Sequence, residues 1–371
     1  MEDEDRKGTE DGTVGVVGAG VAGLSCARRL SQAGVPVTVL DRGRGPAGRA
    51  ATRRVEIESG HVLRFDHGAQ YFTVRDGRFR EAVDGWIRAG AAAPWEGRIG
   101  RLPPDGGGRA GRGERAGRWV GVPGMSAVGR HLARGLEVQW RTDVGAVRPA
   151  REGRGGPPWT LVEKGGSGAE LGPFRAVVLA LPAPQAAPLL EGAAGAARGE
   201  GHAGGAGTVG RLAAAAAGHE TRPCWAAMAA FGVRLPVPVD GAFVREGPVD
   251  WAARNSSKPG RAAWPDAWVL HASPAWSAER LDDPPAEVAA ELLQAFFRAA
   301  GLDHRDPLHL AGHRWRYARS AEPREEGALA AGDAGVVLAG DWLAGDRVEG
   351  AWVSGRAAAE RLLEGGLAHR A

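Results

Sequence analysis

The sequence of 371 residues has few cysteines, few lysines and no long hydrophobic run. Its two cysteines, Cys26 and Cys224, lie far apart and form no Cys-x-x-Cys pair, which argues against a disulfide framework, a zinc site and a dithiol redox centre. No stretch approaches the roughly 18 apolar residues of a membrane-spanning helix. Residues 1–12 are acidic and lack an apolar core, unlike a secretory signal or a transit peptide. We therefore expect a cytoplasmic protein without a membrane span.

The chain also lacks a large excess of charge of one sign. Its 47 lysines and arginines nearly balance 44 acidic residues, and only Lys7, Lys164 and Lys258 are lysines. No stripe of basic residues is interleaved with stacking aromatics, so a nucleic-acid partner is not expected. The hydrophobic share of 43% is typical of a globular protein, and the length allows one large or two interleaved domains.

The N-terminal region has the pattern of a strand–helix–strand unit. Residues 13–17 form a short apolar run that ends in glycine, which predicts a buried strand. Residues 21–32 place apolar side chains at helical spacing and are followed by Gly34 as a stop signal. Residues 35–40 form a second apolar, β-branched run. Together these segments predict one βαβ unit.

The turn of this unit carries the spacing Gly-x-Gly-x-x-Gly at Gly18, Gly20 and Gly23. The first glycine permits the tight turn, the second lets a pyrophosphate approach the backbone, and the third lets helix and strand pack closely. Asp41 ends the second strand, where its carboxylate can accept ribose hydroxyls. Such a motif alone is a weak signal in a glycine-rich chain, but its position between strand and helix favours a dinucleotide site.

Three later segments favour FAD over NAD as the dinucleotide. Gly48-Arg49-Ala50 is similar to the second glycine–arginine element of flavin enzymes, in which Arg49 neutralises the pyrophosphate. A late strand at residues 335–339 ends in Gly340-Asp341, where flavin enzymes hold a ribityl hydroxyl. Glu349-Gly350-Ala351 opens the last helix, whose N-terminus points donors at the flavin pyrimidine. The alternatives are an ordinary surface arginine and a plain strand and helix.

Several motifs together resemble the renalase-like branch of the flavin amine oxidase superfamily, from about Val14 to Leu363. They are the first glycine turn, Asp66-His67-Gly68-Ala69-Gln70-Tyr71-Phe72-Thr73, Val178-Leu179-Ala180-Leu181-Pro182, Gly340-Asp341 and Glu349-Gly350-Ala351. The resemblance implies oxidation of wrongly reduced NAD(P)H isomers, with electrons passing through FAD to oxygen and release of hydrogen peroxide. The superfamily also holds amine oxidases, desaturases and protoporphyrinogen oxidases, so the flavin motifs do not fix the substrate.

The resemblance also implies which residues contact the cofactor. Ala22, Arg49, Gln70 and Tyr71 match positions that contact FAD in the family, the last two near the flavin ring. The full set of expected FAD-binding residues is Gly18, Gly20, Ala22, Gly23, Asp41, Arg42, Gly48, Arg49, Gly68, Ala69, Gln70, Tyr71, Val144, Gly340, Asp341, Glu349, Gly350 and Ala351.

The expected fold is α/β and p-hydroxybenzoate-hydroxylase-like, with a Rossmann-like FAD-binding domain built from discontinuous segments and an inserted α+β substrate domain. Glycine-rich strand–turn–helix units lie at both ends of the chain, and aromatic-rich strands lie between them. We assign residues 13–75, 118–190 and 330–365 to the FAD-binding domain, 76–117 and 217–329 to the substrate domain, and 191–216 to a Gly/Ala-rich linker.

The central segment offers candidates for substrate binding but no catalytic triad. Hydride transfer to a flavin needs positioning more than acid–base residues, so a missing triad is expected. His271, in a predicted strand, and Tyr71 are the catalytic candidates, although a core histidine is the simpler reading of His271. Tryptophans here either stack on a flat ring or fill the core. The run 255–260, with Arg254 and Arg261 beside it, either meets phosphates or forms a loop.

The sequence therefore predicts an FAD-dependent oxidoreductase that takes a hydride from a small reduced molecule, with oxygen as acceptor. We expect no metal site, since His309 and His313 fall in a predicted strand. A flavin amine oxidase or desaturase and an NAD(P)-dependent dehydrogenase are the enzymatic alternatives. A flavin-binding scaffold without turnover is the alternative of another class. The substrate and the oligomeric state stay open.

Overall fold

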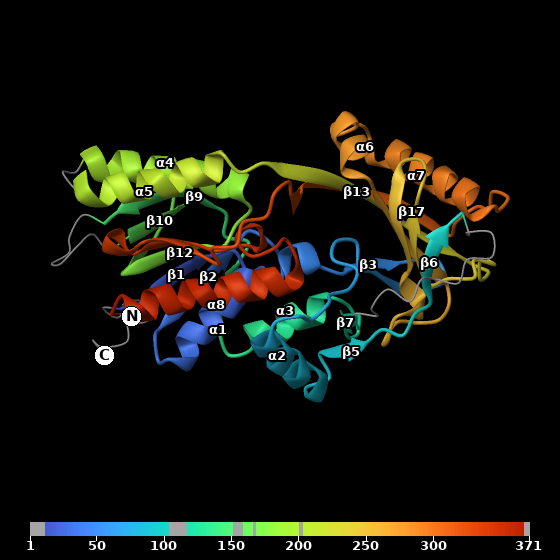
Figure 1. The fold of residues 1–371 in the computed structure, drawn as a ribbon, viewed down its shortest axis with the longest axis horizontal. Helices are drawn as coiled ribbons and strands as arrows, with labels where there is room; N and C mark the ends of the chain where they lie inside the picture. Colours follow the sequence, from blue (N-terminus) through green and yellow to red (C-terminus); the bar gives the residue numbers. More distant parts are fainter. Residues whose placement is uncertain (1–11, 104–116, 151–158, 166–167, 200–202, 367–371) are drawn as a thin grey trace, which may run out of the picture. The chain divides into compact units, whose positions relative to one another are not determined.

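The structure, a computed structural model, describes residues 12–103, 117–150, 159–165, 168–199 and 203–366. The chain divides into two compact units (Figure 1), each described below by itself. Unit 1 consists of the residues up to Gly48, Leu132–Glu220 and the residues from Ser320 onwards. Unit 2 consists of Arg49–His131 and Thr221–Arg319. Both units are therefore assembled from segments that are distant in the sequence.

Unit 1 is built on a six-stranded sheet whose central strands are apolar on both faces. Its order is β18 (Leu329–Ala331), β19 (Val336–Leu338), β12 (Ala176–Leu179), β1 (Val14–Val17), β2 (Val37–Asp41) and β8 (Glu137–Trp140). β1 pairs in parallel with β2 and β12, and all four residues of both β1 and β12 are buried. This burial on both faces is the pattern expected of a parallel sheet covered by helices.

Two pairs of helices cover unit 1 (Figure 1). α1 (Val21–Gln32) lies along α8 (Val348–Glu364), where a side chain on Gly355 would overlap the Ala22 carbonyl oxygen. α4 (Ala183–Gly199) and α5 (Ala203–Ala217) pack over the antiparallel sheet, whose strand order is β11 (Glu170–Phe174), β10 (Trp159–Glu163) and β9 (Val144–Pro149). The dinucleotide-type βαβ unit predicted at the N-terminus is confirmed.

The segment 191–216, expected to be a linker, is instead mostly helical. α4 and α5 occupy most of it, and their alanines alternate with leucine and valine at helical spacing. Ala193, Val209 and Ala213 are buried in the same core cluster as Trp159. The prediction was wrong because small side chains were read as a sign of flexibility. Alanine has the highest helix propensity, and its size lets two helices approach closely.

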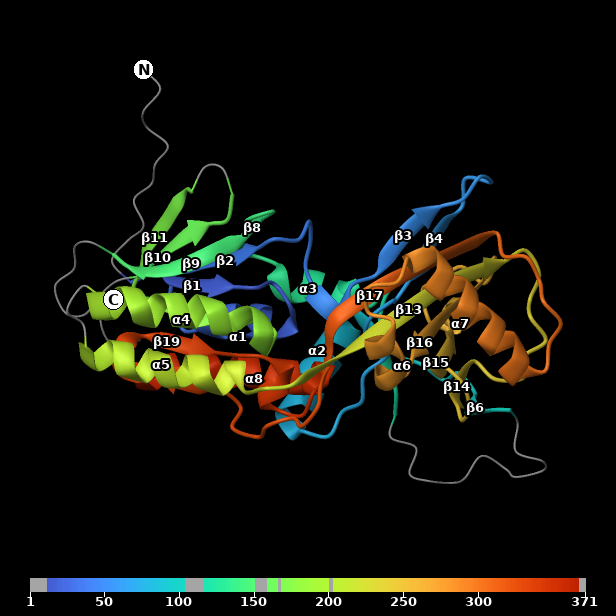
Figure 2. The same cartoon turned by 90° about the horizontal axis from the view of Figure 1, so that it is seen from above.

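Unit 2 is built on a mostly antiparallel six-stranded sheet. Its order is β17 (His309–Ser320), β13 (Thr221–Phe231), β16 (Asp266–Ala272), β15 (Val249–Arg254), β14 (Gly241–Val244) and β6 (Ile99–Leu102). α6 (Pro274–Glu279) and α7 (Pro285–Ala300) lie over one face of this sheet (Figure 2). The apolar stripe of α7, including Leu292 and Phe296, packs on Trp225 and Trp268.

The opposite face of this sheet carries smaller elements. The hairpin of β3 (Arg53–Glu56) and β4 (Val62–Phe65) places Leu63 and Phe65 against Met228 and Val269. Unit 2 also contains α2 (Gly77–Arg88), α3 (Ser126–Ala133), and the two-stranded sheet of β5 (Ala92–Pro94) and β7 (Trp119–Gly121).

The expected α/β fold class is confirmed, whereas the unit boundaries differ from the predicted domains. Residues 49–75 and 118–131 fall in unit 2, although the sequence placed them with the cofactor domain. The hairpin explains the difference, because its buried side chains join the core of the unit 2 sheet.

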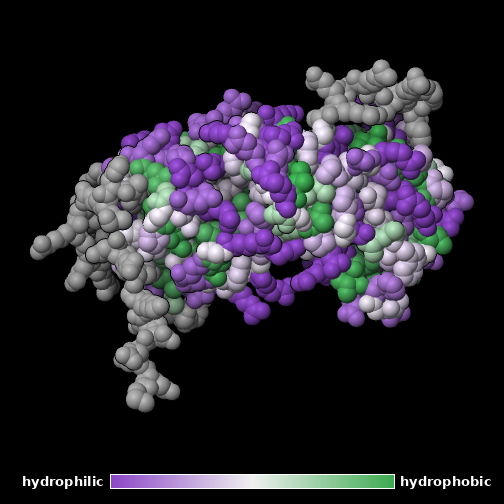
Figure 3. All heavy atoms as spheres, turned by 90° about the horizontal axis from the view of Figure 1, so that it is seen from below, coloured by the Kyte–Doolittle hydropathy of each residue, from purple (hydrophilic) through white to green (hydrophobic). Residues whose placement is uncertain are grey.

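Hydrophilic residues surround small hydrophobic groups on the face shown in Figure 3. No helix in the described part of the chain is long and apolar enough to cross a membrane.

Candidate functional site

The glycine turn of unit 1 has the geometry that its spacing predicts. Gly18 has a φ of 106°, a conformation that favours glycine. A side chain on Gly23 would overlap the Gly18 carbonyl oxygen, so only glycine lets α1 approach β1 this closely. A Cβ on Gly20 would meet nothing within 4 Å, so open space lies beside this backbone. The turn therefore offers room for a ligand at the start of α1.

The N-terminus of α1 is prepared for an anion. Gly20 is the N-cap residue and provides no side-chain hydrogen bond, and the first turn contains no acidic residue. The helix dipole and the first amide groups thus face the open space beside Gly20. Asp41 lies next to this turn, since its Oδ2 accepts from the Ala19 amide at 2.6 Å and its Oδ1 from the Gly43 amide at 2.6 Å. Each carboxylate oxygen can still accept a second bond, as from a ribose hydroxyl.

A second helix N-terminus of unit 1 follows β19. The Gly340 amide is 2.8 Å from Ser354 Oγ, and the adjoining Asp341 is 8% exposed. Glu349 lies in the first turn of α8, whose N-cap has no side-chain hydrogen bond. A side chain on Gly350 would overlap the Ala344 carbonyl oxygen. These are the features expected of the strand and helix that hold the flavin end of the cofactor.

The other residues assigned to the cofactor in unit 1 lie near these features or in the core. Gly48 approaches the Gly20 backbone, because a Cβ on Gly48 would be 3.3 Å from Gly20 Cα. The Arg42 guanidinium lies against Gln185, whose amide oxygen, turned toward it, accepts two bonds of 3.1 Å. Val144 is buried in the core cluster beneath α4. Ala22 is buried on α1, and Ala351 follows Gly350 in α8.

In unit 2, the backbone of Arg49 contacts the Asp66-to-Thr73 segment. Its carbonyl oxygen accepts from the Ala69 amide at 2.9 Å, and a side chain on Gly68 would overlap this oxygen. The Arg49 guanidinium donates to the carbonyl oxygens of Tyr317, at 3.4 Å, and Ala318, at 3.2 Å. The pyrophosphate role of Arg49 stays a prediction.

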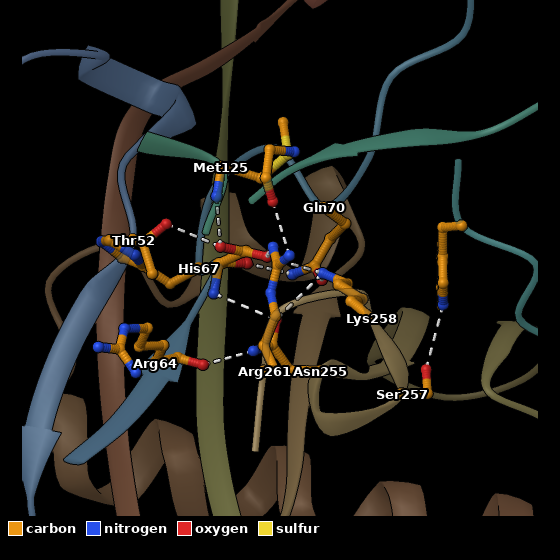
Figure 4. A network of polar contacts seen from close by, with 12 residues as sticks. Thr52, Arg64, His67, Gln70, Met125, Asn255, Ser257, Lys258 and Arg261 are labelled. Carbon is orange, nitrogen blue, oxygen red and sulfur yellow. Dashed lines mark hydrogen bonds and ion pairs between the residues drawn. The ribbon is translucent and has the colours of Figure 1, made fainter. Parts of the chain in front are cut away.

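A buried polar network follows in the same segment (Figure 4). Asp66 and Lys258 are fully buried and form an ion pair of 3.2 Å, and Arg261 pairs with the same Asp66 oxygen. The other Asp66 oxygen accepts from Thr52 Oγ1 at 2.8 Å and from the Met125 amide at 2.9 Å. Every oxygen of this buried carboxylate therefore has donors, as burial of a charge requires.

The ionisation of this network follows from burial and pairing. Burial tends to raise the pKa of Asp66, but the nearby charges of Lys258 and Arg261 outweigh it and hold the pKa below its ordinary value. Burial lowers the pKa of Lys258 to about 8, although Asp66 acts in the opposite direction. Lys258 is therefore mostly protonated at pH 7. Two cations facing one carboxylate leave a net positive charge inside unit 2.

The network fixes the orientation of Gln70. Lys258 Nζ donates to Gln70 Oε1 at 3.0 Å, and Gln70 Nε2 donates to the Asp66 carbonyl oxygen at 2.6 Å. Lys258 donates its third bond to Asn255 Oδ1 at 3.1 Å. All three ammonium donors are thus used, and the Gln70 amide cannot turn over without losing two bonds.

His271 lies on β16, beside Gln70. Its Nε2 lies 3.1 Å from the His67 carbonyl oxygen and 3.3 Å from Gln70 Nε2. Burial lowers the pKa of His271 to about 4, so the ring is neutral at pH 7. The His271 ring is therefore held among buried groups of unit 2, and its catalytic role stays a prediction.

Aromatic rings surround Tyr71 next to this network. The Tyr71 ring lies 6.1 Å from that of Trp95 and 5.5 Å from that of Trp251, measured between centroids. The Arg118 guanidinium is 5.3 Å from the centre of the Tyr71 ring. Gln70, Tyr71, His271 and these tryptophans all belong to unit 2, so the structure brings the two catalytic candidates into one neighbourhood.

Comparison with known proteins agrees with this geometry. Residues 16–86 match a family described as NAD(P)-binding Rossmann-like domain, and residues 109–363 match the family described as flavin containing amine oxidoreductase. The second match covers more than half of the chain. The protein belongs to the flavin-containing amine oxidoreductase family.

Solved structures of this fold are similar over nearly the whole chain. Cyclohexylamine oxidase from Brevibacterium oxydans has a TM-score of 0.69 and 13% identity, with 95% of this chain and 99% of the other covered. Putrescine oxidase bound to putrescine has a TM-score of 0.60 and 12% identity, with the same 95% and 99% coverage. At these identities the similarity shows a shared fold.

Since the protein belongs to this family, it is an FAD-dependent oxidoreductase. The residues of unit 1 fit FAD, because the open space at Gly20 and the uncapped N-terminus of α1 suit a pyrophosphate. Asp41 suits a ribose, and Asp341 and the start of α8 suit the flavin end. The individual contacts stay predictions.

The structure corrects the sequence reading of the segment from Arg254 to Arg261. Arg254 is buried and pairs with Asp240 and Asp266, while Lys258 and Arg261 pair with Asp66. Each of these cations has a carboxylate partner inside unit 2, which argues against the hypothesis that they contact substrate phosphates directly. Among the tryptophans, Trp225 and Trp268 belong to the hydrophobic core, as the alternative of core packing predicted.

The sequence placed Lys258 in a segment that either meets phosphates or forms a loop, and it did not reveal the buried contacts of Lys258 with Asp66 and Gln70. The composition held a signal, because the chain uses arginine almost everywhere and has only three lysines. A lysine kept in an arginine-rich chain indicates a position where a compact ammonium with three donors is needed. Its partners Asp66 and Gln70 lie far away in the sequence, so the spacing did not reveal them.

Buried neutral histidines of unit 2 predict a pH-dependent stability. Burial is the main cause that lowers the pKa of His67 to about 3, of His271 to about 4 and of His313 to about 4. Below the ordinary pKa of 6.5 the unfolded chain takes up protons that the folded chain excludes, so stability falls as the pH falls from about 6.5 to about 4. For each fully buried histidine, linkage gives a loss of about 2 kcal/mol between pH 7 and pH 5.

Urea denaturation at pH 7, 6 and 5 measures this effect. His67→Phe should flatten the pH dependence, because it removes one titrating ring whose Nδ1 has no hydrogen-bond partner. His304→Gln, at an exposed histidine, is the control and should leave the slope unchanged. A slope that is the same in His67→Phe and the wild type would show that His67 does not titrate in this range.

Proposed function

We propose that this enzyme belongs to the renalase-like branch and oxidises isomers of reduced pyridine nucleotides. The substrate loses a hydride from its dihydropyridine ring and becomes an aromatic pyridinium. Molecular oxygen is the proposed acceptor. It takes up the two electrons, the proton of the hydride and one proton from solvent, so that hydrogen peroxide forms.

The net positive charge of the network around Lys258 carries this proposal. Lys258 and Arg261 face the single carboxylate of Asp66, and Arg118 lies over Tyr71. An alkyl amine is a cation at neutral pH and is repelled by such surroundings. A dihydropyridine ring is neutral and its nucleotide carries phosphates, so the same charge favours it. The charge therefore supports a nucleotide over an amine as substrate.

The shape of the neighbourhood supports a flat substrate. Tyr71, Trp95 and Trp251 provide ring faces within one cluster. Aromatic faces stack well on a planar heteroaromatic ring, with centroids 4.5–7 Å apart as a general range. A flexible alkyl amine gains less from such surfaces.

The residues of this chain act by positioning. Bound FAD supplies the acceptor for the hydride and passes the electrons on to oxygen. The Lys258 network holds the Gln70 amide in one orientation, and the neutral ring of His271 lies beside this amide, with its Nε2 3.3 Å from Gln70 Nε2. A dihydropyridine gains aromaticity when it loses hydride, so no strong base is needed. The absence of a triad is consistent with this chemistry.

Anaerobic mixing of the holoenzyme with candidate substrates tests the proposal. The panel contains 1,2- and 1,6-dihydro-NAD, ordinary NADH, putrescine and cyclohexylamine, and the absorbance of bound flavin is followed. We expect rapid bleaching by the isomers, slow or no bleaching by NADH, and none by the amines. After admission of air, colour and hydrogen peroxide should appear together. Bleaching by amines with no response to any dihydropyridine would overturn the proposal.

A flavin amine oxidase or desaturase is the second candidate. It is favoured by the family's description and by the fold shared with cyclohexylamine oxidase and putrescine oxidase. The same substrate panel distinguishes the two candidate functions, because the amines are cations whereas the dihydro-dinucleotides carry negative phosphates. Flavin that is reduced by no substrate would instead favour a binding scaffold without turnover.

A further inference from the structure

The hairpin of β3 and β4 carries two arginines directly opposite each other. Arg54 pairs with Arg64 in the antiparallel register, while Leu63 and Phe65 at alternate positions are buried against the unit 2 sheet. Successive side chains of a strand point to opposite faces, so both arginines lie on the face turned away from this core. Like charges directly opposite in a sheet destabilise it. The arginine pair therefore destabilises the hairpin, and the structure of the hairpin alone does not explain why two arginines stand opposite each other.

A third arginine joins this pair from α3. The Ser126 amide at the start of α3 donates to Thr52 Oγ1, next to β3, at 3.1 Å, which places this helix beside the hairpin. Burial and then the charges of Arg54 and Arg64 lower the pKa of Arg130. Arg130 Nη1 donates to Ser126 Oγ at 2.7 Å, one helical turn earlier, and this bond orients its side chain. We call Arg54, Arg64 and Arg130 the arginine cluster.

No carboxylate balances the arginine cluster in the described part of the chain. None of its members forms an ion pair there, although many other arginines of unit 2 do, such as Arg254 with Asp240 and Arg316 with Asp282. Glu56 shares the outer face of the hairpin but forms no ion pair with the cluster. Three repelling cations held together without a counter-charge are typical of a site that receives an anion.

The cluster is held on rigid elements. Asn255 Nδ2 donates to the Arg64 carbonyl oxygen, and Thr52 Oγ1 accepts from the Ser126 amide at 3.1 Å. Asn255 Oδ1 also accepts from Lys258 Nζ at 3.1 Å, so one side chain connects the strand of Arg64 to the network that holds Gln70 (Figure 4). These bonds hold the backbone that carries the arginines, while the Arg54 and Arg130 side chains are exposed.

We infer that the arginine cluster binds the diphosphate of the nucleotide substrate. This inference rests on the proposed function and locates the part of the substrate that carries its charge. The planar guanidinium group bonds a phosphate through two parallel N–H groups, which makes arginine the preferred residue for this anion. A diphosphate offers several oxygens and at least two negative charges, which match three cations. Inorganic pyrophosphate shares this chemistry and serves as a probe that cannot be oxidised.

Calorimetric titration of the holoenzyme with pyrophosphate tests binding without turnover. We expect pyrophosphate to bind the wild type, and the double variant Arg54→Gln/Arg130→Gln to bind it at least tenfold more weakly. Arg88→Gln, at an exposed arginine of α2 without an ion pair, should bind as the wild type does. The melting temperature of the double variant should stay the same or rise, because repulsion is relieved. Unchanged pyrophosphate binding in the double variant, or no binding to the wild type at millimolar concentration, overturns the inference.

Steady-state kinetics with two matched substrates separates the cluster from the chemistry. For a dihydro-dinucleotide isomer, the double variant should raise KM at least tenfold and leave kcat unchanged. For the corresponding dihydropyridine riboside, which has no phosphate, KM should not change. An equal rise for both substrates would show a structural role and overturn the inference. If no dihydropyridine is oxidised at all, the proposed function fails, while arginine-dependent pyrophosphate binding still supports the anion site.

Discussion

Asp66→Asn is expected to lower the free energy of unfolding by about 3–5 kcal/mol. The amide keeps the size of the side chain but removes the only carboxylate that pairs with Lys258 and Arg261 in the buried network. Two cations then lie in the interior of unit 2 without a counter-charge. Breaking a buried ion pair from one side is costly for this reason, even where the intact pair itself adds little stability.

The pH dependence identifies the cause of this loss. Lys258 has a pKa of about 8 in the wild type, and removal of the Asp66 charge lowers it further. At pH 9 the lysine of the variant is neutral and its burial costs less, so the destabilisation should be smaller at pH 9 than at pH 6. Urea denaturation at both pH values measures the difference. An equal loss at both would show that packing, and not charge, is responsible.

Two further variants serve as controls for Asp66→Asn. Asp303→Asn changes an exposed carboxylate without an ion pair and should alter stability by no more than about 0.5 kcal/mol. The double variant Asp66→Asn/Lys258→Met removes one of the stranded cations and should be more stable than the sum of the single variants predicts. Strict additivity would contradict the coupling between these two side chains.

Gly20→Ala is expected to weaken FAD binding by about a hundredfold, which corresponds to about 2.8 kcal/mol. The backbone of Gly20, with φ of −72° and ψ of 179°, is one that alanine adopts freely, and the new methyl group would contact nothing in the protein. The methyl group instead occupies the space in which we place the pyrophosphate. Stability of the apoprotein should therefore stay within about 0.5 kcal/mol of the wild type.

Titration of apoprotein with FAD, followed by flavin fluorescence, measures this effect alongside urea denaturation. Gly192→Ala in α4 also adds a methyl group in open space and should leave FAD affinity unchanged. Gly23→Ala should lose both stability and affinity, since its Cβ overlaps the Gly18 carbonyl oxygen. Wild-type affinity in Gly20→Ala would mean that the cofactor does not approach the backbone there.

The sequence predicted those features that depend on neighbouring residues. The strand–turn–helix around Gly18, Gly20 and Gly23 follows from local periodicity and from the conformational freedom of glycine, and the structure confirms the fold. The apolar stripe of α7 also repeats at helical spacing, so this helix follows from local periodicity as well. The opposite error arose at residues 191–216, where the absence of large side chains hid two helices that are stabilised by close packing.

By itself, the sequence determined the dinucleotide-type turn, the α/β class and the flavin motifs, since each is written in a few adjacent residues whose backbone conformation is locally restricted. Only the tertiary structure decided that Lys258 and Arg261 pair with Asp66 and that Arg54, Arg64 and Arg130 form no ion pair within the described residues. The physical reason is that ionic interactions act through space between side chains that are far apart in the chain. Whether a charge is buried, paired or open to a ligand is therefore fixed only when the strands and helices have packed.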